Sequence, residues 1–163
     1  MRYHNITKDD MLNGEGLRTV LWVAGCSPHC PQCHNPVTWD INGGLVFDEQ
    51  AKEELFEELK KDYVSGVTFS GGDPFHLENR EEIGALAKEI REKFPDKTIW
   101  LYTGYEWEEI CHLSFLSNID VIVDGKFKIE EKDDNLHWKG SANQRVIDVK
   151  ASLRAGEVRL YQE

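Results

Sequence analysis

Three cysteines within a stretch of eight residues are the feature of this sequence most able to carry chemistry. Cys26, Cys30 and Cys33 have the spacing C-x3-C-x2-C, so one tight loop can direct three sulfur atoms at a single point. Three thiolates can bind three corners of a 4Fe-4S cluster and leave the fourth iron open to a substrate. A structural zinc ion is the alternative, with His29 or His34 as its fourth ligand. The spacing favours the iron–sulfur cluster and leaves zinc open.

Length, charge and hydropathy narrow the class of protein that holds this site. The chain has 163 residues, which suits one core, so we expect a single domain over residues 1–163. The formal charge of −11 and the lack of a Lys/Arg cluster disfavour a nucleic-acid partner. No stretch is apolar enough for a membrane span or a signal peptide, so we expect no membrane partner and a cytoplasmic location. Thiols in the cytoplasm stay reduced, which favours a metal over disulfides.

Hydrophobic periodicity predicts the elements that position the cysteines. Apolar and β-branched runs predict strands at residues 17–23, 67–69, 98–102, 119–123 and 145–149. Helical spacing predicts one helix after an N-cap at Asp48, with a buried stripe of Ala51, Leu55, Leu59 and Tyr63, and further helices over residues 83–94 and 106–116. Strands that alternate with helices predict right-handed βαβ units. The fold class is therefore α/β, with mostly parallel strands.

Four unusual loops each come directly after a predicted strand. They are the cysteine loop and residues 70–74, 103–105 and 124–126. Parallel α/β folds bind ligands at the carboxyl ends of their strands, so we expect these four loops to share one rim. The Gly-Gly-Asp-Pro sequence within residues 70–74 is also typical of a plain turn.

The cysteine loop resembles the signature loop of the radical S-adenosylmethionine superfamily. An ordered set of motifs over nearly the whole chain is similar to one branch, the anaerobic ribonucleoside-triphosphate reductase activating proteins. The motifs are NGEGLR at residues 13–18, CHNP at 33–36 with Thr38 and Trp39, SGGDP at 70–74, WLYTGY at 100–105, VDGKF at 123–127 and WKGSANQ at 138–144. Family members commonly have Pro, Gly, Tyr and Arg where this chain has Glu15, Gln32, His34 and Lys139. None of these departures removes a cysteine.

The resemblance implies a fold, a reaction and a set of site residues. The fold would be a partial, open βα barrel, and the chemistry would be cleavage of S-adenosylmethionine by a 4Fe-4S cluster. Cys26, Cys30 and Cys33 would be the cluster ligands and the catalytic centre. The cofactor-binding residues would be Gln32, Cys33, His34, Gly71, Gly72, Asp73 and Thr103, with the Asp73 carboxylate adding negative charge beside the cofactor's ammonium group.

The resemblance also implies two protein partners. A reduced flavodoxin-like or ferredoxin-like protein would supply the electron. The large catalytic subunit of the reductase would present a loop whose glycine loses a hydrogen atom and becomes a glycyl radical. The alternatives are an activase for another glycyl-radical enzyme such as pyruvate formate-lyase, a deazapurine-forming radical enzyme, an electron-transfer iron–sulfur protein and a zinc-stabilised binding module. The short chain favours the reductase, because formate-lyase activases are longer.

Single residues carry further expectations. Asp124 and Lys126 are expected to form an ion pair at the rim or to meet the partner. Cys111 is expected to be a small buried residue within a helix. The hydroxyl of Thr103 has two interpretations, a contact to the cofactor or the cap of a helix. Trp138, in a loop, is expected to pack around the site or the partner.

Overall fold

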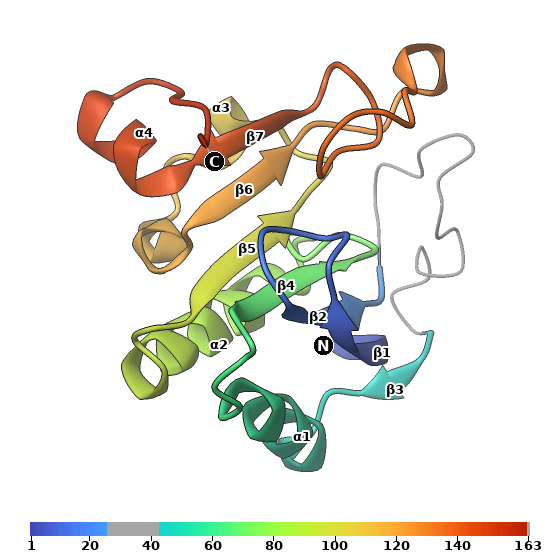
Figure 1. Cartoon of the computed structure of the whole chain (residues 1–163), viewed down its shortest axis with the longest axis vertical. Coiled ribbons are helices and arrows are strands. Elements are labelled where there is room, and N and C mark those ends of the chain that lie inside the picture. Colours follow the sequence, from blue (N-terminus) through green and yellow to red (C-terminus); the bar gives the residue numbers. More distant parts are fainter. Residues whose placement is uncertain (26–42, 163) are drawn as a thin grey trace.

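A computed structural model of the protein describes residues 1–25 and 43–162, and the described strands form one sheet (Figure 1). The strands are β1 (Arg2–Asp10), β2 (Arg18–Val23), β3 (Leu45–Val46), β4 (Gly66–Gly71), β5 (Thr98–Tyr102), β6 (Val121–Asp124) and β7 (Arg145–Asp148). The α-helices are α1 (Glu49–Leu59), α2 (Arg80–Lys93), α3 (Trp107–Ile110) and α4 (Val149–Ala155), and two short 3-10 helices are η2 (Ser114–Asn118) and η3 (Ile129–Glu131). None of the helices in this part of the chain is long and apolar enough to cross a membrane.

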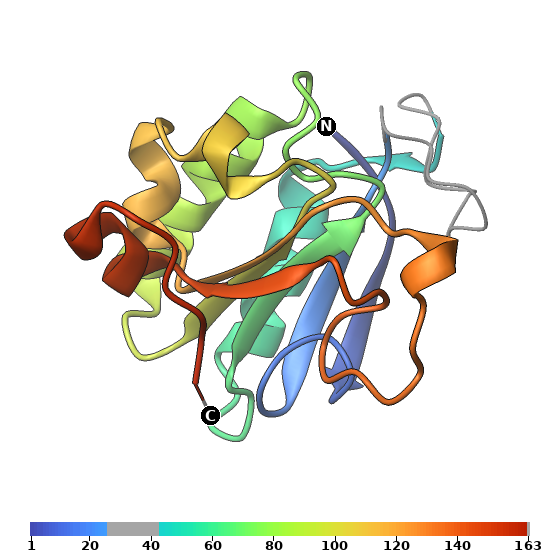
Figure 2. The same ribbon diagram turned by 90° about the horizontal axis from the view of Figure 1, so that it is seen from above.

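The strand order, β3-β1-β2-β4-β5-β6-β7, follows from the connections. β2, β4, β5 and β6 are neighbours in chain order and run parallel. Each crossover moves one strand further in the same direction, so crossovers of one hand put their helices on one face. Figure 2 shows α1 and α2 together on that face. β1, β3 and β7 pair antiparallel, which leaves an open sheet with β3 and β7 at its edges and confirms the α/β class with a parallel centre.

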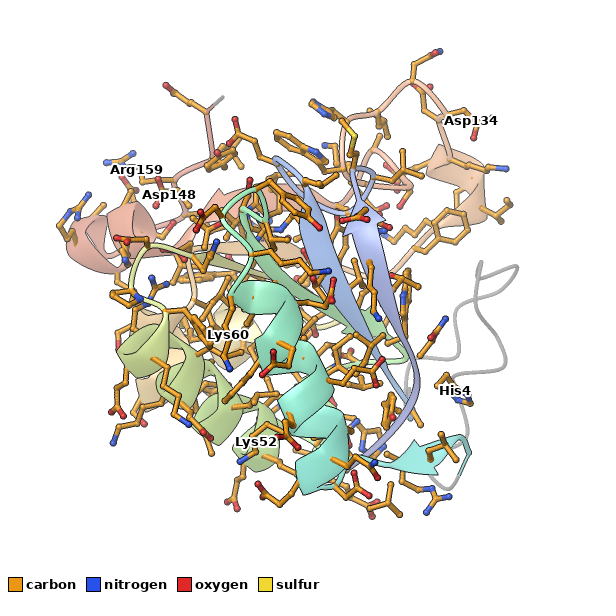
Figure 3. All side chains as sticks on the ribbon, turned by 60° about the horizontal axis from the view of Figure 1, so that its bottom comes forward. His4, Lys52, Lys60, Asp134, Asp148 and Arg159 are labelled. Carbon is orange, nitrogen blue, oxygen red and sulfur yellow. The ribbon has the colours of Figure 1, made fainter. Side chains whose placement is uncertain are left out.

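The first predicted helix forms where its cap and apolar stripe place it. The Asp48 carboxylate accepts a hydrogen bond from the Ala51 N–H at 2.9 Å, as expected of an N-cap. Leu55 and Leu59 are buried, but Tyr63 lies beyond the end of α1 and is 57% exposed, so its place in the stripe was wrong. On the outer side of α1, Lys52 reaches across to Glu89 of α2 at 3.1 Å (Figure 3).

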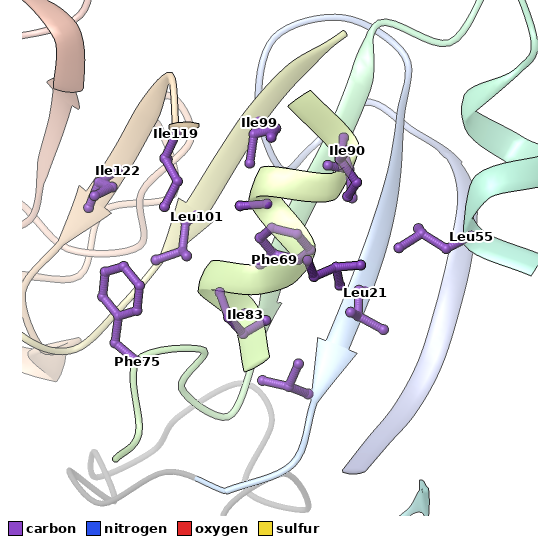
Figure 4. Packing of buried hydrophobic residues seen from close by; sticks show 14 of the residues in the cluster. Leu21, Leu55, Phe69, Phe75, Ile83, Ile90, Ile99, Leu101, Ile119 and Ile122 are labelled. Atoms are coloured by element: carbon purple, nitrogen blue, oxygen red, sulfur yellow. The ribbon is translucent and has the colours of Figure 1, made fainter. Parts of the chain in front are cut away.

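Successive side chains of a strand point to opposite faces of the sheet, so the buried side chains form two groups, one on each face. On β5, Ile99 and Leu101 face the helices, whereas Trp100 packs on the opposite face, called the inner face below. Between the sheet and α2, Phe69 and Ile83 belong to the larger core, seen in Figure 4. The inner face is covered by the loops of residues 11–17 and 125–144, which are opposite the helices in Figure 2.

Arg18 is a fully buried cation on the inner face at the start of β2. Its guanidinium donates five hydrogen bonds of 2.7 to 2.9 Å. The acceptors are the hydroxyls of Thr68 and Thr98 and the backbone oxygens of Glu15, Val67 and Thr98. Burial lowers the pKa of Arg18 to about 10, so the group stays charged at neutral pH. The side chain therefore fastens the loop before β2 to β4 and β5.

Two regions differ from the sequence prediction. The helix expected over residues 106–116 is broken into α3, which ends at Ile110, and the separate η2. Cys111, the C-cap residue of α3, is exposed and not buried as expected, because the side chains that α3 buries are those of Trp107 and Ile110. No strand was predicted for residues 2–10, which form β1. Ile6 is the only buried residue of this strand, so its sequence lacks a buried stripe.

Candidate functional site

The carboxyl ends of the parallel strands meet at one edge of the sheet, as the order of motifs predicts. Val23 at the end of β2 is in register with Gly71 at the end of β4. The backbone N–H of Gly72 donates to Val23 O at 2.8 Å, and that of Asp73 donates to Gly25 O at 2.6 Å. Gly25, the last described residue before the cysteines, therefore lies directly beside the glycine-rich loop. Cys26, Cys30, Cys33, Gln32 and His34 themselves lie outside the described residues, as do Thr38 and Trp39.

Gly71 is required by the approach of two strand ends. Its φ is +104°, in the region that favours glycine, and a Cβ atom there would lie 2.6 Å from the backbone nitrogen and oxygen of Val23. Any side chain would push β4 away from β2. The residues that follow are packed inward, with Asp73 fully buried. The loop is thus a fixed part of the rim.

Asp73 joins the loop after β4 to the loop after β5. One carboxylate oxygen accepts hydrogen bonds from the N–H of Phe75 at 2.9 Å and the hydroxyl of Thr103 at 2.7 Å, and the other accepts from the N–H of Gly104 at 2.9 Å. Burial raises the pKa of the Asp73 carboxyl, and these hydrogen bonds act in the opposite direction. Both oxygens are therefore engaged by the protein, while a charge effect of this carboxylate on a bound cofactor stays a prediction.

Thr103 braces the same junction. Its hydroxyl donates to Asp73 and accepts from the N–H of Tyr105 at 3.2 Å, and the residue is 5% exposed. The cap of α3 is provided by Glu106, which forms a capping box with Glu109. Of the two interpretations of Thr103, the helix cap is wrong, and the contact to a cofactor stays a prediction.

Replacing Thr103 by valine should lower the free energy of unfolding by about 1–3 kcal/mol, because the buried Asp73 carboxylate loses one donor. The lost hydrogen bond stabilises the charged form of the Asp73 carboxyl, so the pKa of Asp73 should rise further in the valine variant. The loss of stability should therefore become smaller as the pH falls and Asp73 is protonated. Thr103→Ser keeps the hydroxyl and is the matched control. Chemical denaturation at neutral and acid pH measures the loss of stability and its dependence on pH. A valine variant as stable as the serine variant at neutral pH would show that the Thr103 hydroxyl does not stabilise this junction.

A pocket of about 560 Å³ opens between the rim and the inner face. Its rim side is formed by Gly71, Gly72, Thr103, Gly104 and Gly125, and its walls include Leu12, Trp22, Tyr102, Phe127 and Trp138. This volume lies within the range of small-molecule sites. A larger hollow of about 1200 Å³ lies at the amino ends of the strands, where Ser65 and Thr98 line it. That hollow contains none of the predicted site residues, so the smaller pocket is the candidate site.

Tyr102 and Trp138 fix one wall of the pocket. The Tyr102 hydroxyl donates to the backbone oxygen of Trp138 at 2.6 Å, and burial raises the pKa of Tyr102, which keeps the phenol protonated. Trp138 has a φ of +67° and packs edge-on against Trp100, with ring centroids 4.9 Å apart. A non-glycine residue in this conformation must be held by its surroundings, as these contacts do. Trp138 lines the pocket, as its position in a loop suggested.

The loop of residues 125–144 is anchored to the rim by Gln144. Its side-chain oxygen accepts from the N–H groups of Gly140 at 2.9 Å and Ser141 at 3.1 Å, and its side-chain nitrogen donates to Gly125 O at 3.0 Å. Sequence reasoning gave Gln144 no role beyond its motif. In the sequence, the Gln144 amide follows a short run of small residues. A polar side chain beside such a run can hydrogen-bond to the nearby backbone, and this could have indicated its role.

The ion pair expected at the end of β6 has a different cation. Asp124 is 1% exposed and pairs with Arg145 of β7 at 2.6 Å, while it also accepts from the N–H of Trp107 at 2.8 Å. Lys126 is exposed. The expectation of an Asp124–Lys126 pair was wrong, because the antiparallel register places Arg145 directly opposite Asp124.

Comparisons with known proteins identify the family of this chain. Residues 12–147 match the family described as "4Fe-4S single cluster domain". The chain is 43% identical over 146 residues to the anaerobic ribonucleoside-triphosphate reductase-activating protein of enterobacteria phage T4, which covers 90% of this chain and 93% of the phage protein. It is 39% identical over 150 residues to the proteins of that name from Salmonella typhi and Escherichia coli strain K12, which covers 90% of this chain and 97% of each relative. The chain belongs to the family of anaerobic ribonucleoside-triphosphate reductase-activating proteins.

Proposed function

We propose that this chain is a radical S-adenosylmethionine enzyme that generates the glycyl radical of the anaerobic ribonucleoside-triphosphate reductase. Cys26, Cys30 and Cys33 hold a 4Fe-4S cluster and form the catalytic centre. The observation that carries the proposal is the pocket at the strand ends, which is lined by Gly71 and Gly72 of the glycine-rich loop, while the next residue of that loop, Asp73, donates its N–H to Gly25 O at 2.6 Å, just before the cysteines. The family membership supports the reductase as the partner.

The described rim fits a small polar cofactor, and the chemistry of the three cysteines fits a cluster. Three thiolates leave one iron of a 4Fe-4S cluster without a protein ligand, as the cofactor requires. Gly71 lets the backbone of the rim come close to a bound ammonium group, and a cofactor of this size suits the pocket of about 560 Å³. The walls combine aromatic surface, from Trp22 and Tyr102 among others, with polar side chains such as Lys139.

Cys26, Cys30 and Cys33 would hold the cluster, which when bound would supply the electron for reductive cleavage of S-adenosylmethionine and so for removal of a hydrogen atom from a glycine α-carbon. The residues of this chain do the binding. Backbone oxygens of Gly71 and Gly72 would accept hydrogen bonds from the cofactor's ammonium group, and Gln32, Cys33 and His34 would contribute further contacts to the cofactor. Asp73 and Thr103 hold this rim in shape, and the aromatic wall excludes water.

Two partners complete the proposal. The large catalytic subunit of the reductase presents its glycine loop at the open side of the fold, a partial βα barrel formed by residues 1–163 as one domain. A reduced flavodoxin-like or ferredoxin-like protein delivers the electron.

Anaerobic purification followed by metal analysis tests the proposal. The protein should be brown and contain about four irons per chain. With dithionite as reductant it should convert S-adenosylmethionine to methionine and 5′-deoxyadenosine in equal amounts, with the adenosyl carbon ending as a methyl group. A colourless protein that holds one zinc and cleaves no cofactor would replace the proposal with the zinc-stabilised binding module.

A further inference from the structure

Asn79 is a fully buried amide that does not do what its position predicts. It is the N-cap residue of α2, yet its side chain makes no capping hydrogen bond. An asparagine at this position normally accepts a hydrogen bond from the second or third N–H of the helix. The Asn79 side chain instead donates to Ala24 O at 2.8 Å and to Asp73 O at 3.2 Å. The helix gives up a cap, and the amide joins two loops.

The chemistry of these two acceptors fixes the orientation of the amide. Both are backbone carbonyl oxygens, so only the NH₂ group of Asn79 can face them; the reversed amide would place three oxygens together. In this orientation the side-chain oxygen of Asn79 is buried and lacks a hydrogen-bond partner among the described residues. A buried amide with an unsatisfied oxygen costs stability. Such a residue is expected where its remaining bonds serve a purpose other than stability.

The two carbonyls belong to the two loops of the candidate site. Ala24 lies two residues before Cys26, and Asp73 is the last residue of the Gly-Gly-Asp sequence. The carboxylate of Asp73 continues the connection to Thr103 and to the N–H of Gly104. Hydrogen bonds therefore run from the start of the cysteine loop through Asn79 to the loops after β4 and β5. Asn79 is the side chain at the crossing point of these loops.

We propose that Asn79 is a positioning residue that sets the spacing between the cysteine loop and the glycine-rich loop. The proposal rests on the proposed function, in which the first loop holds the cluster and the second holds the amino group of S-adenosylmethionine. Asn79 lies behind the rim and acts through the backbone of Ala24 and Asp73. Loss of both bonds should let the two loops separate, so the cofactor should bind more weakly although the cysteines remain.

Two substitutions separate this role from that of a helix cap. Asn79→Asp has the same shape and is an equally good N-cap, but its carboxylate has no donor and repels both carbonyls. Asn79→Ser can cap α2 and is too short to bridge the loops. The matched control is Asp48→Ala, which removes the cap of α1, a bond to the Ala51 N–H on an element away from the rim. If Asn79→Asp does not fold, Asn79→Ser carries the test.

The first measurement is amide hydrogen exchange of the full chain, which needs no cluster and no cofactor. The N–H groups of Gly72 and Asp73 donate across the two loops, so their exchange reports the spacing directly. It should be about 10- to 100-fold faster in the Asn79 variants and unchanged relative to the rest of the sheet in Asp48→Ala. Equal protection in Asn79→Ser and the unsubstituted chain would overturn the proposal, as would equal acceleration in Asp48→Ala.

The second measurement is the steady-state cleavage of S-adenosylmethionine by the anaerobically prepared chain. Asn79→Ser should keep about four irons per chain, while its KM for the cofactor rises about 10- to 100-fold. An unchanged KM with faster exchange would overturn the link between loop spacing and binding. If the unsubstituted chain cleaves no cofactor, the proposed function fails, and the exchange result still decides whether Asn79 spaces the loops.

Discussion

Replacing Cys30 by serine should leave the anaerobically purified chain without its iron and without cleavage of S-adenosylmethionine. A serine hydroxyl is not ionised at neutral pH, whereas the cluster needs a thiolate at each of its three protein-bound corners. Iron should fall from about four per chain to a trace, and the brown colour should disappear. Metal analysis, the visible spectrum and the yield of 5′-deoxyadenosine measure these losses together.

Cys111→Ser is the matched control for this experiment. Cys111 is exposed, and the described hydrogen bond of its side chain is a weak one, from its sulfur to Glu108 O at 3.9 Å. The same chemical change there should leave iron and cleavage as they are in the unsubstituted chain. Retained iron and cleavage in Cys30→Ser would show that Cys30 is no cluster ligand. Loss of iron in Cys111→Ser would show that the ligand set of Cys26, Cys30 and Cys33 is wrong.

Arg18→Met should lower the free energy of unfolding by about 3–5 kcal/mol, because several acceptors around the buried guanidinium lose their donor at once. The five hydrogen bonds of the guanidinium end on buried and partly buried groups of three different segments, and methionine can satisfy none of them. Arg18→Lys should recover only part of the loss, because an ammonium lacks the planar fork that reaches Thr68 and Thr98 at once. Chemical denaturation gives the values.

The loss of stability in Arg18→Met should come from the buried position of Arg18 and its hydrogen bonds, and not from the change in net charge. Arg154, on α4, is exposed and serves as the matched control; Arg154→Met should change the free energy of unfolding by less than about 0.5 kcal/mol. Similar losses in Arg154→Met and Arg18→Met would show that net charge decides stability. A stable Arg18→Met variant would show that the loop before β2 is held by other contacts.

The sequence was sufficient to predict those parts of the fold whose signals are local. Alternation on β5 separates Ile99 and Leu101 from Trp100, and Asp48 caps α1 through a bond within its own first turn. The shared rim was also predictable, since parallel strands in chain order must end at the same edge.

What sequence reasoning missed depends on contacts between distant segments. β1 has one fully buried residue, so it carries almost no hydrophobic period. The partner of Asp124 is chosen by the antiparallel register of β7, which no local pattern reveals. Asn79 has the sequence signature of an ordinary N-cap, and only the tertiary structure shows that its amide bonds to Ala24 and Asp73. The proposal that the cysteine loop binds a cluster is supported by the spacing of its cysteines and by the family, because residues 26–42 lie outside the described part of the chain.

The central claim is that this chain places a radical on a glycine of the reductase, and electron paramagnetic resonance tests it most directly. The reduced, iron-loaded chain is incubated anaerobically with S-adenosylmethionine and the large catalytic subunit of the reductase, with the Cys30→Ser variant and a preparation without cofactor as controls. We predict a glycyl radical signal on the reductase only in the complete mixture. No signal on the reductase, together with a signal when pyruvate formate-lyase takes its place, would contradict the claim.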